Sequence, residues 1–371
     1  MNEYEINDIR GENEFKGITF SNFKRSDVKK ELLNSLSTGK IEHALHWSTE
    51  FICCGCFIDL WDIILNFVGK HIHLGNPKLP IYLEMRFNNF KQVVQNGYAG
   101  FEINMRNNNT IRKLFAEIIT ILCISKKKHS IESIKIKKQD EFDITTMSSR
   151  LKASSIQYAA NIYKTDDPKE LYIAINELAY HISSDSRNSL EACYWVEWIL
   201  EFENLCKKKK EICTCECRSF VKVDDKFQRE PVWIIWDILF HVANNNMTNN
   251  SLNNKTNKKV TYCDVTKKIL QSIFELFTIR YTSGTKRKRK YLIYFAISLL
   301  TDTVNLDVNI IENKNTVDNV TKKINLLYKE IKKNEKAPVV DYLFSGVERT
   351  NLDRTIERLE AMNNINTIMR T

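Results

Sequence analysis

The stretch from Ile41 to Phe90 constrains the fold most strongly, because it predicts consecutive amphipathic helices interrupted by one sharp break. Apolar residues recur from Ile41 at spacings of three and four, which places them on one face of a helix that extends to about Phe57. A second helix is predicted to begin at Asp59. The sequence Gly75-Asn76-Pro77 then ends it, because proline cannot continue a helix and restricts the residue before it. Pro80 suits the first turn of a third helix over 81–94.

Helical periodicity continues through the rest of the chain, and we therefore predict an all-α protein. The 371 residues include only 10 glycines and 5 prolines, fewer than the many turns of a β-sandwich or barrel would need. Residues 244–258 are rich in Asn, Thr and Lys and are predicted to form a loop. Thr110 and Asp167 are the expected N-caps of helices. The further predicted helices cover 26–39, 111–124, 168–182, 264–281, 291–300, 317–333 and 350–369.

Two short patterns occur once in each half of the chain and indicate an internal duplication. Ala-x-x-Trp begins at Ala44 and again at Ala192, and Trp-Asp-Ile begins at Trp61 and again at Trp236. In each half an apolar helix and a basic cluster follow. We therefore expect two tandem related helical modules that resemble a collar, because repeated order favours two packed units over one irregular bundle.

The same features predict the domain boundaries. The expected order is a flexible N-terminal arm, a first module, a linker, a second module with Cys/Lys-rich and Asn-rich insertions, and a C-terminal helical extension. The corresponding ranges are 1–25, 26–135, 136–165, 166–303 and 304–371.

Consecutive cations are the strongest candidates for a binding function. Phosphate groups attract such clusters, and binding releases counterions. Tyr281 and Tyr291 flank the last cluster and could stack on bases. We predict nucleic-acid binding, with DNA favoured over RNA; the alternative is that each cluster is a solvated turn, or a nuclear-import-like patch. The candidate residues are Lys126, Lys127, Lys128, Lys286, Arg287, Lys288, Arg289 and Lys290, and a further cluster covers 207–210.

Four cysteines in a lysine-rich segment, Cys206, Cys213, Cys215 and Cys217, are the candidate metal ligands. Zinc binds four such thiolates in a tetrahedron, but zinc ribbons space them as Cys-x2-Cys, so a surface loop with incidental thiols is the alternative. A histidine metal site is also conceivable, with hydrogen-bonded histidines as the alternative; its members would be His43, His46, His71 and His73. Zinc is thus the one cofactor that the sequence raises.

Catalysis is not predicted. Acidic residues lie near the tryptophans in both halves, as Glu50 with Asp62 and as Glu197 with Asp237, and paired carboxylates can perform acid–base chemistry. Ion pairs or helix caps are the simpler roles for them. No nucleophile–base pair and no phosphate-binding loop is present, since Gly39-Lys40 lacks the upstream glycine.

The compartment follows from what the sequence lacks. The first ten residues are polar and acidic rather than basic and apolar, so no secretory signal is expected. The ten cysteines do not have the spacing of a secreted disulfide framework. No apolar window reaches the roughly 18–20 residues needed to cross a bilayer. We expect an intracellular protein with reduced thiols and no membrane partner.

The first half of the chain resembles the C-terminal region of one protein family, that of the Werner-helicase-interacting protein and the bacterial replication-associated recombination protein A. The matching elements are Ala44 and Trp47, the turn 73–77 (His-Leu-Gly-Asn-Pro), and the helix 116–124 with the Lys/Ser-rich turn 125–130 after it. In that family a helical collar follows a clamp-loader-type ATPase and mediates oligomerisation at replication forks. The ATPase is absent here. The whole chain also looks like uncharacterised proteins of large nucleocytoplasmic DNA viruses, a resemblance that implies no activity.

The resemblance and the basic clusters together lead to a functional hypothesis. We expect a non-enzymatic accessory protein of DNA replication or repair that binds nucleic acid, and that binds a partner protein or itself through the collar-like face. If the protein is viral, it would work in the cytoplasm or nucleus of a host cell, or in a virus factory. The alternative is an α-helical protein–protein scaffold, related to viral assembly or translation, without nucleic-acid binding.

Overall fold

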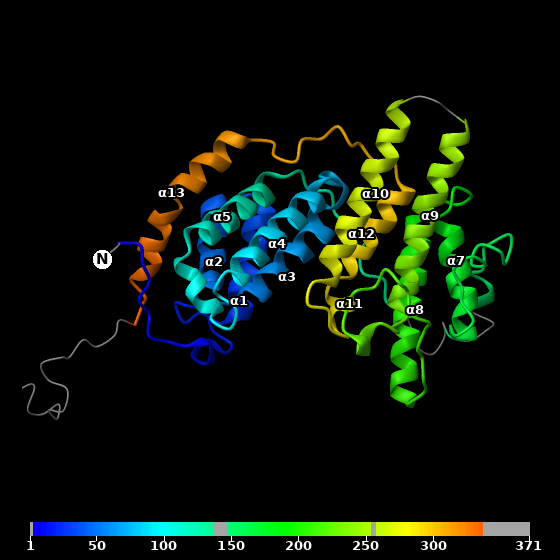
Figure 1. Cartoon of the computed structure of the whole chain (residues 1–371), viewed down its shortest axis with the longest axis horizontal. Helices are drawn as coiled ribbons and strands as arrows, with labels where there is room; N and C mark the ends of the chain where they lie inside the picture. Colours follow the sequence, from blue (N-terminus) through cyan, green and yellow to red (C-terminus); the bar gives the residue numbers. More distant parts are fainter. Residues whose placement is uncertain (1–2, 137–141, 143–146, 254–256, 337–371) are drawn as a thin grey trace, which may run out of the picture.

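The computed structural model describes residues 3–136, 142, 147–253 and 257–336 (Figure 1). These residues form helices and connecting segments and contain no β-strand; one isolated bridge joins Ile18 to Lys24. The predicted all-α fold is confirmed. Within the described part, no helix has both the length and the apolar character needed to cross a membrane. The helix predicted at 350–369 lies outside the described residues.

Five helices make up the first half of the fold. Gly39 ends the first of them in the left-handed conformation, with φ of 71°, which glycine adopts without strain. The N-cap of the fifth is Asn108, whose side chain accepts from the backbone N–H groups of Thr110 and Ile111, so the predicted cap Thr110 is wrong. The helices are α1 (Arg25–Thr38), α2 (Ile41–Cys53), α3 (Phe57–Phe67), α4 (Leu79–Gln95) and α5 (Asn109–Ile124).

The helix break predicted at Gly75-Asn76-Pro77 is a compact turn between α3 and α4, and Gly75 makes its shape possible. It consists of a π-helical turn η2 (Val68–Ile72) and a 3-10 turn η3 (His73–Gly75). A Cβ atom at Gly75 would lie 2.3 Å from the carbonyl oxygen of Lys126, so only glycine lets these two backbones approach. The turn therefore fastens the segment after α5 to the end of α3.

The second half consists of further helices and contains one departure from the predicted pattern. The segment predicted as a loop at 244–258 is largely helical, because α9 continues to Asn253 and α10 begins at Asn257. These two helices extend beyond their neighbours (Figure 1). The helices are α7 (Tyr172–Ile182), α8 (Ser189–Lys209), α9 (Val232–Asn253), α10 (Asn257–Thr278), α11 (Thr285–Lys288) and α12 (Lys290–Thr301), with a 3-10 turn η5 (Lys169–Leu171) before α7.

The two halves pack directly against each other. Helix α4 lies against α10, and η2 lies against α12. At the second contact a Cβ atom on Gly69 would come within 2.9 Å of the carbonyl carbon of Tyr291, so the backbones again touch. The internal duplication stays a prediction: Trp195 is fully buried, whereas its counterpart Trp47 is only partly buried.

The C-terminal part of the described chain belongs to the first half rather than forming a separate extension. Helix α13 (Lys314–Lys332) crosses back and packs on α5, as Figure 1 shows. The guanidinium of Arg112 lies 3.8 Å from the ring centroid of Tyr328, which is fully buried. This contact joins residues more than two hundred positions apart.

The N-terminal residues, predicted to be a flexible arm, are fastened to the fold. Phe15 and Phe20 are completely buried, and the guanidinium of Arg10 lies over both rings at 4.8 and 4.9 Å. Arg10 also forms a buried ion pair with Asp8 at 2.6 Å. The two aromatic anchors and the buried ion pair thus fasten a segment that is otherwise polar.

Asp167, predicted to cap a helix, has a different role. The helical turn after it makes no side-chain cap bond, and Asp167 instead accepts two hydrogen bonds from the Arg218 guanidinium at 2.6 and 2.7 Å. Burial alone would raise the pKa of this carboxyl group, but the bonds from Arg218 and two backbone N–H groups bring it below its ordinary value. The carboxylate thereby holds the Cys/Lys-rich segment against η5.

Candidate nucleic-acid interface

The basic turn at 286–290 lies at the junction of the two halves, and its five cations point in different directions. Helix α11 supplies the first three and α12 begins with the last. Helical geometry rotates successive side chains by about 100°, so a run of five cations cannot face one side. Arg287 and Lys288 are exposed, Lys290 is half-buried, and Lys286 and Arg289 are buried.

Lys286 points into the protein and is neutralised there. Its exposed fraction is 4%, and its ammonium group donates to Glu203 at 2.5 Å and to Glu230 at 2.7 Å. The hydroxyl of Tyr281 donates to the same Glu230 carboxylate at 2.7 Å. Burial would raise the pKa of Glu230, but the Lys286 charge lowers it below its ordinary value. Lys286 and Tyr281 are therefore unavailable to nucleic acid.

Arg289 is likewise structural. Its guanidinium donates to Asp62 of α3 at 2.7 Å and to the carbonyl oxygens of Phe277 and Ile279 at the end of α10. A cation at this position satisfies carbonyl groups that a helix C-terminus leaves without partners. Arg289 thus connects the two halves of the fold. Like Lys286, it is no longer a candidate phosphate ligand.

The first basic cluster is partly exposed. Lys126 and Lys128 are exposed, while Lys127 folds back and donates to the carbonyl oxygens of Leu122 and Cys123 at the end of α5. Burial lowers the pKa of Lys127. Lys126 and Lys128 therefore remain candidates, and Lys127 is a helix cap.

A basic hollow of about 650 Å³ is lined by cations of two clusters, 207–210 and 286–290, and by one lysine outside the clusters. Lys135, in the segment that follows the first cluster, lines it with Lys208 of α8, and Arg287 and Lys290 line it from the turn. Two carboxylates share this wall: Glu201 pairs with Arg287 at 3.1 Å, and Glu197 pairs with Lys290 at 2.7 Å. Four cations against two carboxylates leave a formal surplus of two positive charges.

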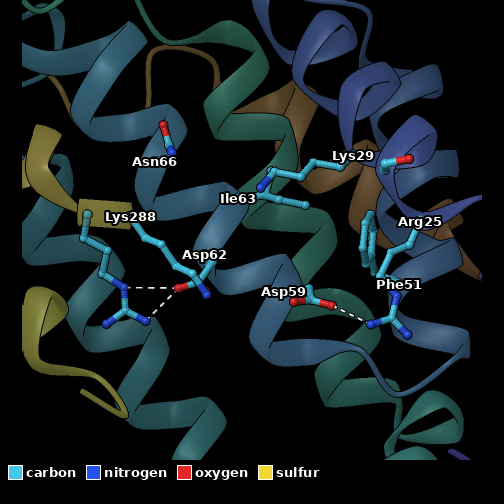
Figure 2. A pocket seen from close by; sticks show the side chains of 10 residues that line it. Arg25, Lys29, Phe51, Asp59, Asp62, Ile63, Asn66 and Lys288 are labelled. Carbon is cyan, nitrogen blue, oxygen red and sulfur yellow. Dashed lines mark hydrogen bonds and ion pairs between the residues drawn. The ribbon is translucent and has the colours of Figure 1, made fainter. Parts of the chain in front are cut away.

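A second hollow, of about 290 Å³, lies beside the same basic turn (Figure 2). Figure 2 shows Arg25 and Lys29 of α1 and Lys288 of the turn around it. Arg289 lines it as well. Asp59 pairs with Arg25 at 2.9 Å, and Asp62 pairs with Arg289. Again four cations meet two carboxylates, so the turn has a positive hollow on each side.

Comparison with known proteins gives no family. No protein-family model matches the chain, and no curated protein or solved structure gives a significant match. The assignment of the site therefore rests on its geometry.

The four cysteines proposed as zinc ligands do not converge. Cys206 and Cys213 lie within hydrogen-bonding range of each other, but Cys217 is exposed. Burial raises the pKa of Cys213 to about 12, which favours the thiol over the thiolate that zinc requires. Among the described residues, no three His, Cys, Asp or Glu side chains are grouped so that they could hold a metal ion.

The acidic residues near the tryptophans form ion pairs and hydrogen bonds. Asp62 pairs with Arg289, Asp237 pairs with Arg218 at 3.1 Å, and Glu197 accepts from Lys290 and from the hydroxyl of Tyr294. Glu50 is buried and accepts from the backbone N–H of Ser21. Each of these carboxylates has a cation or a hydrogen-bond donor as its partner.

Sequence patterns did not reveal Lys29 and Lys135 as members of the site. Each lies outside the runs of three or more consecutive cations, and only the packing of α1 and of residues 133–136 beside the basic turn brings it there. Runs of consecutive cations predict the basic clusters, whereas the two hollows are lined by cations from different segments.

Proposed function

We propose that this chain is a non-enzymatic nucleic-acid-binding protein that holds a phosphate backbone across the basic turn. The observation that supports this is the pair of hollows on either side of residues 286–290, each with two more cations than carboxylates. Phosphate groups of one nucleic-acid strand would occupy both hollows. Lys126 and Lys128 are exposed but line neither hollow. A role in DNA replication or repair rests on the family resemblance and belongs to the same proposal.

Replacing one exposed cation in each hollow tests the proposal without disturbing the buried ion pairs. The variant Lys135→Ala/Lys288→Ala is expected to bind single- and double-stranded DNA roughly tenfold more weakly at low salt. The slope of log affinity against log salt should fall by about 2, because each lost phosphate contact releases about one counterion fewer. Fluorescence anisotropy with a salt titration measures both quantities.

The matched control is Lys226→Ala/Lys333→Ala, which removes the same charge from two side chains that are each 68% exposed. It should leave affinity and slope nearly unchanged. Equal weakening by both variants would mean that only net charge matters. Absence of salt-sensitive binding by the wild-type protein to DNA or RNA would refute the proposal.

A second candidate function, protein docking, is supported by a large cavity on another face. It measures about 770 Å³ and lies between α3, α4 and the end of α10. Its wall includes the rings of Trp61, Phe87 and Phe90, whose centroids lie 5.1 to 6.2 Å apart. Four carboxylates line it, those of Glu12, Glu84, Glu102 and Glu275. The cations on the same wall are Lys91, Arg280 and Arg289, and Arg289 is already paired with Asp62. The occupant that fits this chemistry is an amphipathic helix of a partner protein with basic flanks.

Ile58→Glu is expected to abolish capture of such a partner after nuclease treatment, because Ile58 is 49% exposed and lines the cavity. Ile173→Glu is the control: Ile173 on α7 is 47% exposed and does not line it. Quantitative cross-linking and mass spectrometry compare the two variants. A protein captured equally by both does not occupy the cavity, and the docking role would then be rejected.

A further inference from the structure

His71 and His129 are held next to each other by the backbone around them. His71 belongs to η2, and His129 lies in the segment after α5. The N–H of Lys128 donates to the carbonyl of Ile72 at 3.3 Å, and the N–H of Ser130 donates to the carbonyl of Lys70 at 2.8 Å. These two hydrogen bonds flank the histidines on either side, so the pair is positioned by main chain as well as by its own contact.

The two rings approach through nitrogen atoms. The Nδ1 atoms are 3.2 Å apart, and the rings are nearly perpendicular, with an interplanar angle of 80°. The ring of His71 is stacked on Phe67 with centroids 5.1 Å apart, which limits its rotation. Without an added ion, one Nδ1 must carry a proton and donate it to the other.

The same spacing fits two ligands of one metal ion. Zinc–imidazole bonds are about 2.0–2.1 Å long, so two nitrogens at angles between about 90° and 109° lie about 2.9–3.4 Å apart. The observed separation of 3.2 Å falls within this range. The required change is a tautomeric one: both neutral rings carry their proton on Nε2 and present Nδ1 to the metal.

We propose that His71 and His129 form a binding site for a divalent transition-metal ion such as Zn²⁺ or Cu²⁺. Imidazole nitrogen is a preferred ligand of these ions. No third His, Cys, Asp or Glu among the described residues completes the site, so water or an external ligand fills the other coordination positions. The proposal does not depend on nucleic-acid binding.

The surroundings affect the site in two opposite ways. Burial, and then the charges of Lys70 and His129, lower the pKa of His71 to about 4, so its ring is neutral and able to bind metal near pH 7. The positive charge of Lys70 also repels a divalent ion. The affinity is therefore expected to be lower than that of a closed four-ligand site.

Titration of untagged, chelator-treated protein with Zn²⁺, followed by long-range ¹H–¹⁵N spectra of the histidine rings, tests the site. Zn²⁺ should shift the Nδ1 resonances of two histidines, and these should be assigned to His71 and His129. His129→Ala changes an exposed side chain and should fold normally, yet lower the affinity for this ion by more than about tenfold.

The matched control is His43→Ala, an exposed histidine on α2, which should bind as the wild type does. The ten thiols can bind zinc elsewhere, but such binding would persist in His129→Ala and leave the two imidazole resonances unmoved. Unmoved resonances up to about 1 mM Zn²⁺, or equal affinity in His129→Ala and wild type, would overturn the proposal.

Discussion

Lys286→Met is expected to lower the free energy of unfolding by about 3–5 kcal/mol. In the sequence, Lys286 is one of five consecutive cations that look like an exposed turn. The ammonium group is the shared partner of Glu203 and Glu230, whose exposed fractions are 2% and 9%. Removal of the cation leaves two buried carboxylates without their shared partner. The other lysine near them, Lys207, is half exposed, so its charge compensates them less well. Urea unfolding at neutral pH, followed by tryptophan fluorescence, measures the loss.

Arg287→Met is the matched control one residue away. Its side chain is 51% exposed and its ion pair with Glu201 lies at the surface, so a change within about 0.5 kcal/mol is expected. The double variant Lys286→Met/Glu203→Gln should recover part of the loss, because it removes one of the stranded charges. Similar stabilities for Lys286→Met and Arg287→Met would show that Lys286 is not buried as described.

Gly75→Ala is the second change with a large expected effect, about 3 kcal/mol of destabilisation. The new Cβ atom would lie 2.3 Å from the Lys126 oxygen and 3.0 Å from its carbonyl carbon. Both are backbone atoms, so no side-chain rotation relieves the overlap, and the segment after α5 must move. Thermal unfolding monitored by circular dichroism gives the shift.

Gly284→Ala provides the comparison, since nothing lies within 4 Å of its added Cβ and its φ of −79° suits any residue. It should be neutral or slightly stabilising, by up to about 1 kcal/mol, because alanine reduces the freedom of the unfolded chain. If Gly75→Ala unfolded at the same temperature as Gly284→Ala, the close approach of the turn to Lys126 would be wrong.

The sequence predicted the helices where packing and local signals agree. Apolar spacing located α2 and α5, Gly39 marked the end of α1, and Gly75-Asn76-Pro77 marked the break before α4. Predictions failed where a side chain had both a local and a distant use. Asp167 looked like a helix cap, but Arg218, far along the chain, is its partner.

The site was less predictable because charge in a sequence carries no direction. Lys286 and Lys288 are two residues apart, yet one is buried against Glu203 and the other is exposed beside α1. Whether a cation faces solvent depends on carboxylates placed by other helices, here at separations of 83 and 56 residues. The His71–His129 pair, 58 residues apart, was likewise invisible as a spacing pattern.

The return of α13 to α5 affects the order in which the protein can be completed during synthesis. Ile9 donates its backbone N–H to the carbonyl of Lys336 at 3.1 Å, and Arg10 donates to the carbonyl of Asn334. The first five helices can form early on the ribosome, but the surface of α5 that receives Tyr328 stays uncovered until the second half has been translated. Such long-range closure is slow, so the nascent chain carries an uncovered surface on α5 until α13 has been translated.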